Sequence, residues 1–245
     1  MTNRCKFGLL LASIAMVGLA TLILSQSVSA AGEGKITGTI KLDGAAPHQK
    51  PIDMSKEPTC AQQHAAKPIT TETVVAGANG GLANVVLYLS EGLSPAAASA
   101  AATQPVEINQ KGCQYVPHVV ALDQNQEMKV VNSDQTSHNI HPQPTNNHEW
   151  NKSQPPGTAP FVVKWEAEEM AIPVKCNIHP WMHGYIAVVK GPYAVSDDKG
   201  DFTINNVPPG NYTVTAWQET YAPQTQKVTV TTGKPATADF TFKAK

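Results

Sequence analysis

Metal-binding side chains gather in the nine residues 176–184, which read CNIHPWMHG. Cys176, His179 and Met182 follow one another with two residues between each pair. Thiolate and thioether sulfur are soft donors and imidazole is a borderline one, so this set suits copper better than a hard cation. The spacing lets one tight loop present all three side chains, and it predicts a metal-binding loop that ends where the apolar run YIAVV begins.

A second imidazole must come from another strand, and the segment VVNSDQTSHNIH (130–141) supplies His138 after a strand and a polar turn. Two histidines and a cysteine with a weak axial methionine form the blue-copper arrangement. Zinc is the chemical alternative, since cysteine and two histidines with a fourth ligand also satisfy tetrahedral Zn²⁺, but methionine is a poor zinc ligand. We interpret three further histidines as neighbours of the site or surface residues, with auxiliary copper capture as the alternative: His141, His148 and His183.

Short β-strands are expected to position these ligands. Runs rich in β-branched residues are bounded by Gly, Pro, Asn and Asp at 35–42, 82–89, 118–123, 127–132 and 185–190. The chain has 19 prolines and 17 glycines and only 6% aromatic residues, which is typical of an all-β protein with many corners. The alanine-rich stretch 94–105 predicts either a short helix or a connector.

The beginning of the chain resembles an export signal. Arg4 and Lys6 precede an apolar run, and Val28 and Ala30 are small residues in the pattern that a signal peptidase reads, so we expect cleavage after Ala30. An uncleaved anchor is the alternative. Without this segment 16 basic residues face 19 acidic ones, a net charge of −3, which gives no reason to expect nucleic acid as a partner. We expect a periplasmic or otherwise exported protein with no membrane insertion after cleavage.

Three cysteines remain after the leader. An oxidising compartment favours pairing two of them, and a metal ligand is a reason for the third to stay reduced, so we expect a Cys60–Cys113 disulfide beside a free Cys176. The alternative is a second metal site, because His64 and His118 follow these two cysteines closely.

Residues 106–190 resemble the cupredoxin, or blue copper, family of the amicyanin and plastocyanin kind. The resemblance depends on VVNSDQTSHNIH followed by CNIHPWMHG, and on the preceding pair of strands. It implies a Greek-key β-sandwich that holds one type 1 copper. It also implies His138, Cys176 and His179 as equatorial ligands, with Met182 as the axial one. Asn139 would tie the two ligand loops together, and Pro180 and Trp181 would flank an open His179 as the partner-docking face.

Residues 191–245 resemble the carboxypeptidase regulatory-like, or prealbumin-like, β-sandwich. Asp198, Gly200 and Phe202 precede the run VPPGNY (207–212) in the order of that family. Strands from 34–90 resemble the remainder of the same fold. The cupredoxin segment is then an insertion, unless the early strands instead enlarge the cupredoxin and the tail stands alone.

The sequence therefore predicts a signal peptide (1–30), a β segment with an alanine-rich connector (31–105), a cupredoxin domain (106–190) and a carboxypeptidase regulatory-like domain (191–245). We expect an electron carrier rather than an enzyme, with a cytochrome or dehydrogenase as its transient partner. The alternative is a copper-binding or delivery protein of the envelope. A copper enzyme such as a nitrite reductase or oxidase would need a further catalytic copper, for which the sequence offers no second cupredoxin motif.

Overall fold

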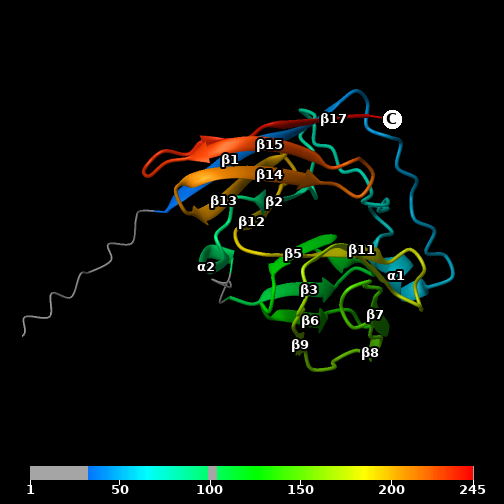
Figure 1. The fold of residues 1–245 in the computed structure, drawn as a ribbon. Helices are drawn as coiled ribbons and strands as arrows, with labels where there is room; N and C mark the ends of the chain where they lie inside the picture. The colour runs from blue at the N-terminus through cyan, green and yellow to red at the C-terminus, as the bar shows by residue number, and fades with distance from the viewer. Residues whose placement is uncertain (1–32, 99–103, 245) are drawn as a thin grey trace, which may run out of the picture. The chain divides into compact units, whose positions relative to one another are not determined.

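A computed structural model describes residues 33–98 and 104–244, and the expected signal peptide lies outside this part of the chain. The described residues are almost entirely β-strand, which confirms the all-β class (Figure 1). Two short helices interrupt the strands: α1 (Pro58–Gln63) and α2 (Pro95–Ala98). No helix in the described part of the chain has the length and apolar character needed to cross a bilayer.

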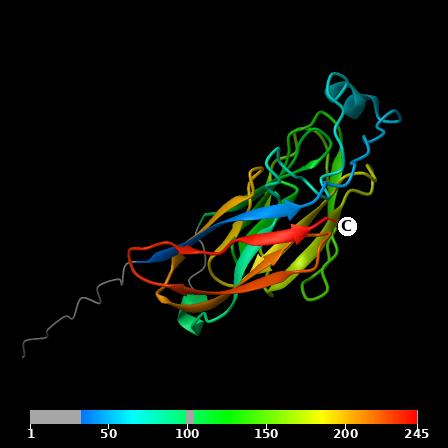
Figure 2. The same cartoon turned by 90° about the horizontal axis from the view of Figure 1, so that it is seen from above.

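The first and last strands of the described chain form one β-sandwich, which we call the terminal sandwich. One sheet has the order β13-β1-β16 with β17 also on β1, and the other has the order β12-β2-β14-β15. Its strands are β1 (Gly34–Asp43), β2 (Val86–Glu91), β12 (Tyr193–Val195), β13 (Asp201–Val207), β14 (Gly210–Trp217), β15 (Gln224–Val230), β16 (Ala236–Thr237) and β17 (Phe240–Lys243). The early strands thus pair with strands that follow Gly191, and Figure 2 shows β1 beside β17.

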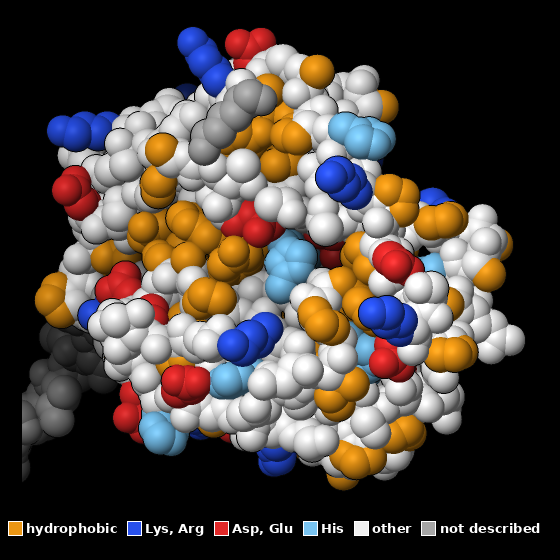
Figure 3. All heavy atoms as spheres, turned by 90° about the vertical axis from the view of Figure 1, so that its right-hand side faces the viewer, with side chains coloured by type: hydrophobic (Ala, Val, Ile, Leu, Met, Phe, Trp, Pro, Cys, Tyr) orange, Lys and Arg blue, Asp and Glu red, His pale blue; other side chains and the backbone are white. Residues whose placement is uncertain are grey.

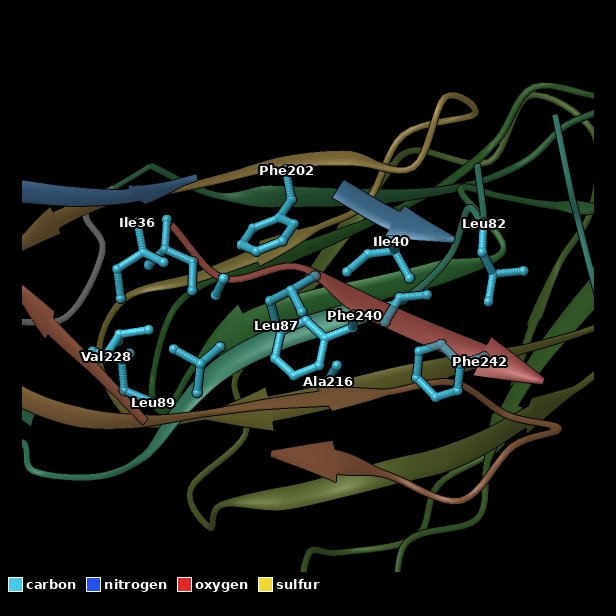
Figure 4. Packing of buried hydrophobic residues seen from close by; sticks show 14 of the residues in the cluster. Ile36, Ile40, Leu82, Leu87, Leu89, Phe202, Ala216, Val228, Phe240 and Phe242 are labelled. Atoms are coloured by element: carbon cyan, nitrogen blue, oxygen red, sulfur yellow. The ribbon is translucent and has the colours of Figure 1, made fainter. Parts of the chain in front are cut away.

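Alternation of apolar and polar residues fixes the faces of this sandwich. Buried and exposed residues alternate along β17 and through most of β13, so apolar side chains enter the core at every second residue. Figure 4 shows Ile36, Leu87 and Phe240 in the space between the two sheets. The Tyr212 hydroxyl donates a hydrogen bond to the carbonyl of Pro208 over 2.8 Å, which fastens the VPPG corner between β13 and β14.

The middle of the chain forms a second β-sandwich, which we call the central sandwich. Its sheets have the orders β5-β11-β10-β7-β8 and β4-β3-β6-β9. Its strands are β3 (Val106–Gln110), β4 (Tyr115–Val116), β5 (Val119–Asp123), β6 (Met128–Asn132), β7 (His138–Pro142), β8 (Lys152–Gln154), β9 (Phe161–Val163), β10 (Glu169–Lys175) and β11 (His183–Val189). β11 is parallel to β5 and β3 is parallel to β6, while the other neighbours are antiparallel.

Strand β5 is buried on both faces. Val120 and Leu122 belong to the core between the two central sheets, whereas Val119 and Ala121 belong to a third apolar cluster. That third cluster also contains Val86 of β2. The period of two along a strand therefore explains why β5 is apolar throughout: one face enters the central core, and the other contacts a strand of the terminal sandwich.

Candidate metal centre

One end of the central sandwich brings three of the four predicted ligands together. His138 is the first residue of β7, and Cys176 follows directly after β10. Strand β10 pairs with β7 through Lys175 and His141, and with β11 through Lys175 and His183, so the ligand loop between β10 and β11 lies beside the start of β7. His138, Cys176 and His179 offer donor atoms that lie within 4.8 Å of one another.

The two imidazoles face each other through their Nδ1 atoms. His138 Nδ1 lies 2.9 Å from His179 Nδ1, and the latter lies 3.8 Å from the sulfur of Cys176. His138 Nε2 lies 2.8 Å from Oδ2 of Asp134. Because a carboxylate only accepts, Nε2 of the neutral His138 carries the proton, and its Nδ1 lone pair points toward His179 and Cys176. These donors fit a metal ion of soft to borderline character.

Hydrogen bonds hold the ligand loop closed. The Cys176 amide donates to the carbonyl of Met182 over 3.1 Å, and the Met182 amide donates to the carbonyl of His179 over 2.9 Å. Met182 is buried in the same core cluster as Cys176. All four predicted ligands are buried: His138, Cys176, His179 and Met182.

Asn139 connects the two ligand segments. Its Oδ1 accepts a hydrogen bond from the Asn177 amide over 2.7 Å and lies 3.4 Å from the sulfur of Cys176. Its Nδ2 donates to Asn151 over 2.8 Å. The amide side chain therefore fixes the distance between the start of β7 and the loop after β10.

The surroundings favour a thiolate at Cys176. Burial raises the pKa of the thiol, but the neighbouring His138 side chain and hydrogen bonds from the backbone of the ligand loop outweigh burial and lower it. Burial also opposes a charged Asp134, yet hydrogen bonds from His138, Cys113 and Gly112 hold the pKa of its carboxyl below the usual range. A metal ligand must be deprotonated, so the lowered thiol pKa suits a cation at this site, and the Asp134 carboxylate adds a negative charge behind His138.

A segment that no sequence pattern predicts covers His179. His179 is 0% exposed, so the expectation that it forms the open edge is wrong. Glu57, just before α1, places Oε2 3.8 Å from His179 Nε2. The Cys60–Cys113 disulfide bonds α1 to the loop before β4. It also leaves neither sulfur available for the alternative second metal site, and His64 instead lies with Nε2 2.8 Å from the carbonyl of Gly112.

The exposed part of the ligand loop is apolar. Pro180 is exposed, Trp181 is half-buried, and Ile178, which sequence reasoning missed, is 44% exposed. The Trp181 ring lies 5.2 Å from the His179 ring between centroids, and its Nε1 donates to the carbonyl of Cys113 over 3.1 Å. Trp181 thus connects a buried predicted ligand with the surface.

The extra histidines lie in different places. His141 is held between Asn177, 3.2 Å from its Nδ1, and Glu149, 2.6 Å from its Nε2. His148 is exposed. His183 faces away into another group of side chains with His118. Asp134 is the contact that sequence reasoning missed, although its position four residues before His138 was a visible signal.

Comparisons with known proteins find likeness to two families. Residues 186–243 match the family described as carboxypeptidase regulatory-like domain, from within β11 to the end of β17. No curated protein matches the chain.

Among solved structures, a copper-containing nitrite reductase from Thermus scotoductus is 19% identical with a TM-score of 0.33, and the match covers 40% of this chain and 27% of that one. The chain therefore spans about a quarter of that enzyme's length. A purple cupredoxin from Nitrosopumilus maritimus is 21% identical with a TM-score of 0.29, covering 34% of this chain and 98% of its own. A mutant of amicyanin in the Cu(I) form is 16% identical with a TM-score of 0.30, and the match covers 42% of this chain and 97% of that one. The chain is thus similar to carboxypeptidase regulatory-like domains in sequence near its end, and its similar solved structures include cupredoxins.

Proposed function

We propose that the protein is an exported electron carrier that binds one copper ion through His138, Cys176, His179 and Met182. The observation that carries this proposal is the convergence of two imidazole nitrogens and one cysteine sulfur within 4.8 Å, from the ends of different strands. Copper bound there supplies one-electron exchange between Cu(I) and Cu(II). Under this proposal the chain is a carrier and not an enzyme.

The protein's part in such a function is to hold the ligands still. Asp134 fixes the ring of His138, and Asn139 joins its segment to the ligand loop. Ligands that are fixed by their own hydrogen bonds need little rearrangement when the charge of the metal changes. Burial of all four predicted ligands keeps water away and slows loss of the ion.

Electrons would enter and leave through the apolar surface of the ligand loop. Ile178 and Pro180 are exposed, and Trp181 lies against the ring of His179. Weak redox complexes use small interfaces, so this modest surface is sufficient for a transient partner such as a cytochrome or a dehydrogenase. Figure 3 shows the side of the molecule that faces right in Figure 1, where hydrophobic side chains reach the surface among histidines and charged residues.

Retention of copper separates this function from copper delivery. We expect the protein to keep one equivalent against a Cu(II) chelator when oxidised and against bathocuproine disulfonate when reduced. His148→Ala, which removes an exposed histidine, is the matched control and should behave like the wild type. Release of the ion on reduction would instead support an envelope protein that delivers Cu(I).

A further inference from the structure

A second group of metal-binding side chains lies outside the proposed copper site. His118 immediately precedes β5, His183 begins β11, and Glu219 follows β14. Their donor atoms lie within 4.8 Å of one another. These residues are far apart in the sequence, and none of them has a place in the proposed electron-carrier function.

The contacts of His118 define the group. Its Nε2 lies 2.6 Å from Oε1 of Glu219, and its Nδ1 lies 4.0 Å from Oε2 of Glu72. Its ring meets the His183 ring edge-on, with 5.2 Å between centroids. The side chains of His118 and Glu219 are only 2% and 5% exposed, whereas that of Glu72 is 36% exposed. The group is therefore largely shielded from solvent and is open to it mainly on the side of Glu72.

Neighbouring groups hold the donors in place. His183 Nδ1 lies 3.0 Å from the carbonyl of Trp181, which can only accept, so the neutral ring carries its proton there and keeps its lone pair on Nε2. Gln114 donates to Glu72 over 3.2 Å. Gly184 permits the close approach of the two segments, because a Cβ at that position would lie 2.6 Å from the carbonyl of His118.

The charges of the group favour the binding of a cation. Among the residues that the structure describes, no lysine or arginine forms an ion pair with Glu72 or Glu219. Two carboxylates thus share one pocket with two imidazoles, and a divalent ion would neutralise both.

We propose that His118, His183 and Glu219 bind a divalent transition-metal ion of borderline character such as Zn(II), with Glu72 beside them as the second negative charge. Imidazole and carboxylate together suit Zn(II), and bonds of about 2.0–2.2 Å place tetrahedral donors roughly 3.4 Å apart. The 2.6 Å contact between His118 and Glu219 would therefore open by less than about 1 Å on binding.

The bound ion would join the two sandwiches. His118 and His183 belong to the central sandwich, whereas Glu219 follows a strand of the terminal sandwich. His183 also follows Met182 directly in the chain, so the ion would fix the end of the copper-ligand loop. An ion that binds only the folded state raises the unfolding temperature of the protein.

Titration of the copper-loaded protein with Zn(II), followed by calorimetry and by thermal unfolding, tests the proposal. We expect one further equivalent to bind and to raise the unfolding temperature. Glu219→Gln, which preserves the size of the side chain, and His118→Gln should each weaken Zn(II) binding more than about 100-fold while the blue absorption stays. His148→Ala, which removes an exposed histidine, should bind Zn(II) like the wild type.

Binding of no Zn(II) beyond the copper site, or equal binding by folded Glu219→Gln protein, would overturn the proposal and leave an ion pair between His118 and Glu219. Circular dichroism of each variant shows whether it is folded. The double variant His138→Ala, Cys176→Ala lacks two proposed copper ligands and must still bind one Zn(II) that Glu219→Gln removes. This result separates a failure of the second site from a failure of the copper proposal.

Discussion

Asp134 joins the predicted copper ligand His138 to the disulfide-bonded Cys113. Its Oδ2 lies 2.8 Å from His138 Nε2 and accepts the amide N–H of Cys113 over 2.8 Å, while its Oδ1 accepts that of Gly112. The carboxylate is therefore in contact with a proposed metal ligand on one side and with the loop that anchors α1 on the other. A buried negative charge in this position increases the basicity of the imidazole and favours the more highly charged state of the metal.

Replacement of Asp134 by Asn should raise the reduction potential of the copper-loaded protein. Asn keeps a polar contact to His138 but removes the negative charge that stabilises Cu(II) over Cu(I). We expect an increase of about 60 mV, equal to a tenfold change in the affinity ratio for the two states. Cyclic voltammetry measures the shift, and Glu107→Gln, which removes an exposed carboxylate, should leave the potential unchanged. A fall in potential would contradict this role for Asp134.

Removal of the disulfide by Cys60→Ser and Cys113→Ser together should destabilise the fold. The bond joins residues 53 positions apart, and the loss of a loop constraint of this length corresponds to about 4 kcal/mol of unfolding free energy. Urea denaturation measures the difference. Because α1 and Glu57 would loosen over His179, copper should also exchange faster with a chelator. Unchanged exchange in a folded variant would show that this segment does not protect the ion.

Replacement of Trp181 by Leu should slow electron transfer to a protein partner without moving the potential much. The indole contacts the ring of His179 and is half-exposed, whereas it supplies no donor to the predicted ligand set. We expect a fall of about tenfold in the second-order rate constant, which corresponds to about 1.4 kcal/mol. Stopped-flow oxidation by a c-type cytochrome is the measurement, and Val162→Ala, at an exposed apolar residue of β9, is the control. Equal rates would exclude Trp181 from the route.

The Glu169 carboxylate should make the free energy of unfolding depend on pH. Its carboxylate accepts hydrogen bonds from the amides of Thr145, Asn146 and Asn147. Burial raises its pKa, but these bonds and the Asn147 side chain outweigh burial and lower it from the ordinary value of 4.5. A lowered folded-state pKa gives stability that is present above about pH 4.5 and is lost as the pH falls through the folded value.

Glu169→Gln should therefore cost about 1–3 kcal/mol of unfolding free energy at pH 7, because the amides of Thr145, Asn146 and Asn147 lose a charged acceptor. The difference from the wild type should shrink as the pH falls below 4.5. Denaturation curves at several pH values check this trend. A difference that stays constant across the range would show that the charge of Glu169 is not what stabilises the loop.

The parts of the site that sequence could predict are those with local patterns. Cys176, His179 and Met182 share one loop, and His138 and Asn139 follow a strand, so their spacing alone indicated a common site. The alternating strands were equally visible, because burial on one face leaves a period of two. The cover over His179 had no such signal, since residues 44–57 carry no regular pattern and Glu57 acts through a single contact.

The proposed Zn(II) site was even harder to predict from the sequence than the cover over His179. Glu72, His118, His183 and Glu219 come from four separate segments, and only the folded chain brings them together. The position of His183 beside Met182 in the sequence predicts a neighbour of the copper site or a surface residue. His183 is the first residue of β11, and its ring contacts His118 rather than the proposed copper ligands.

The visible and electron paramagnetic resonance spectra of the protein with one equivalent of Cu(II) test the central claim most directly. The account predicts an intense sulfur-to-copper charge-transfer band with narrow copper hyperfine splitting, and loss of both in folded Cys176→Ser protein. A pale protein with an ordinary Cu(II) spectrum, or a coloured Cys176→Ser variant, would contradict the assignment of Cys176 as a copper ligand.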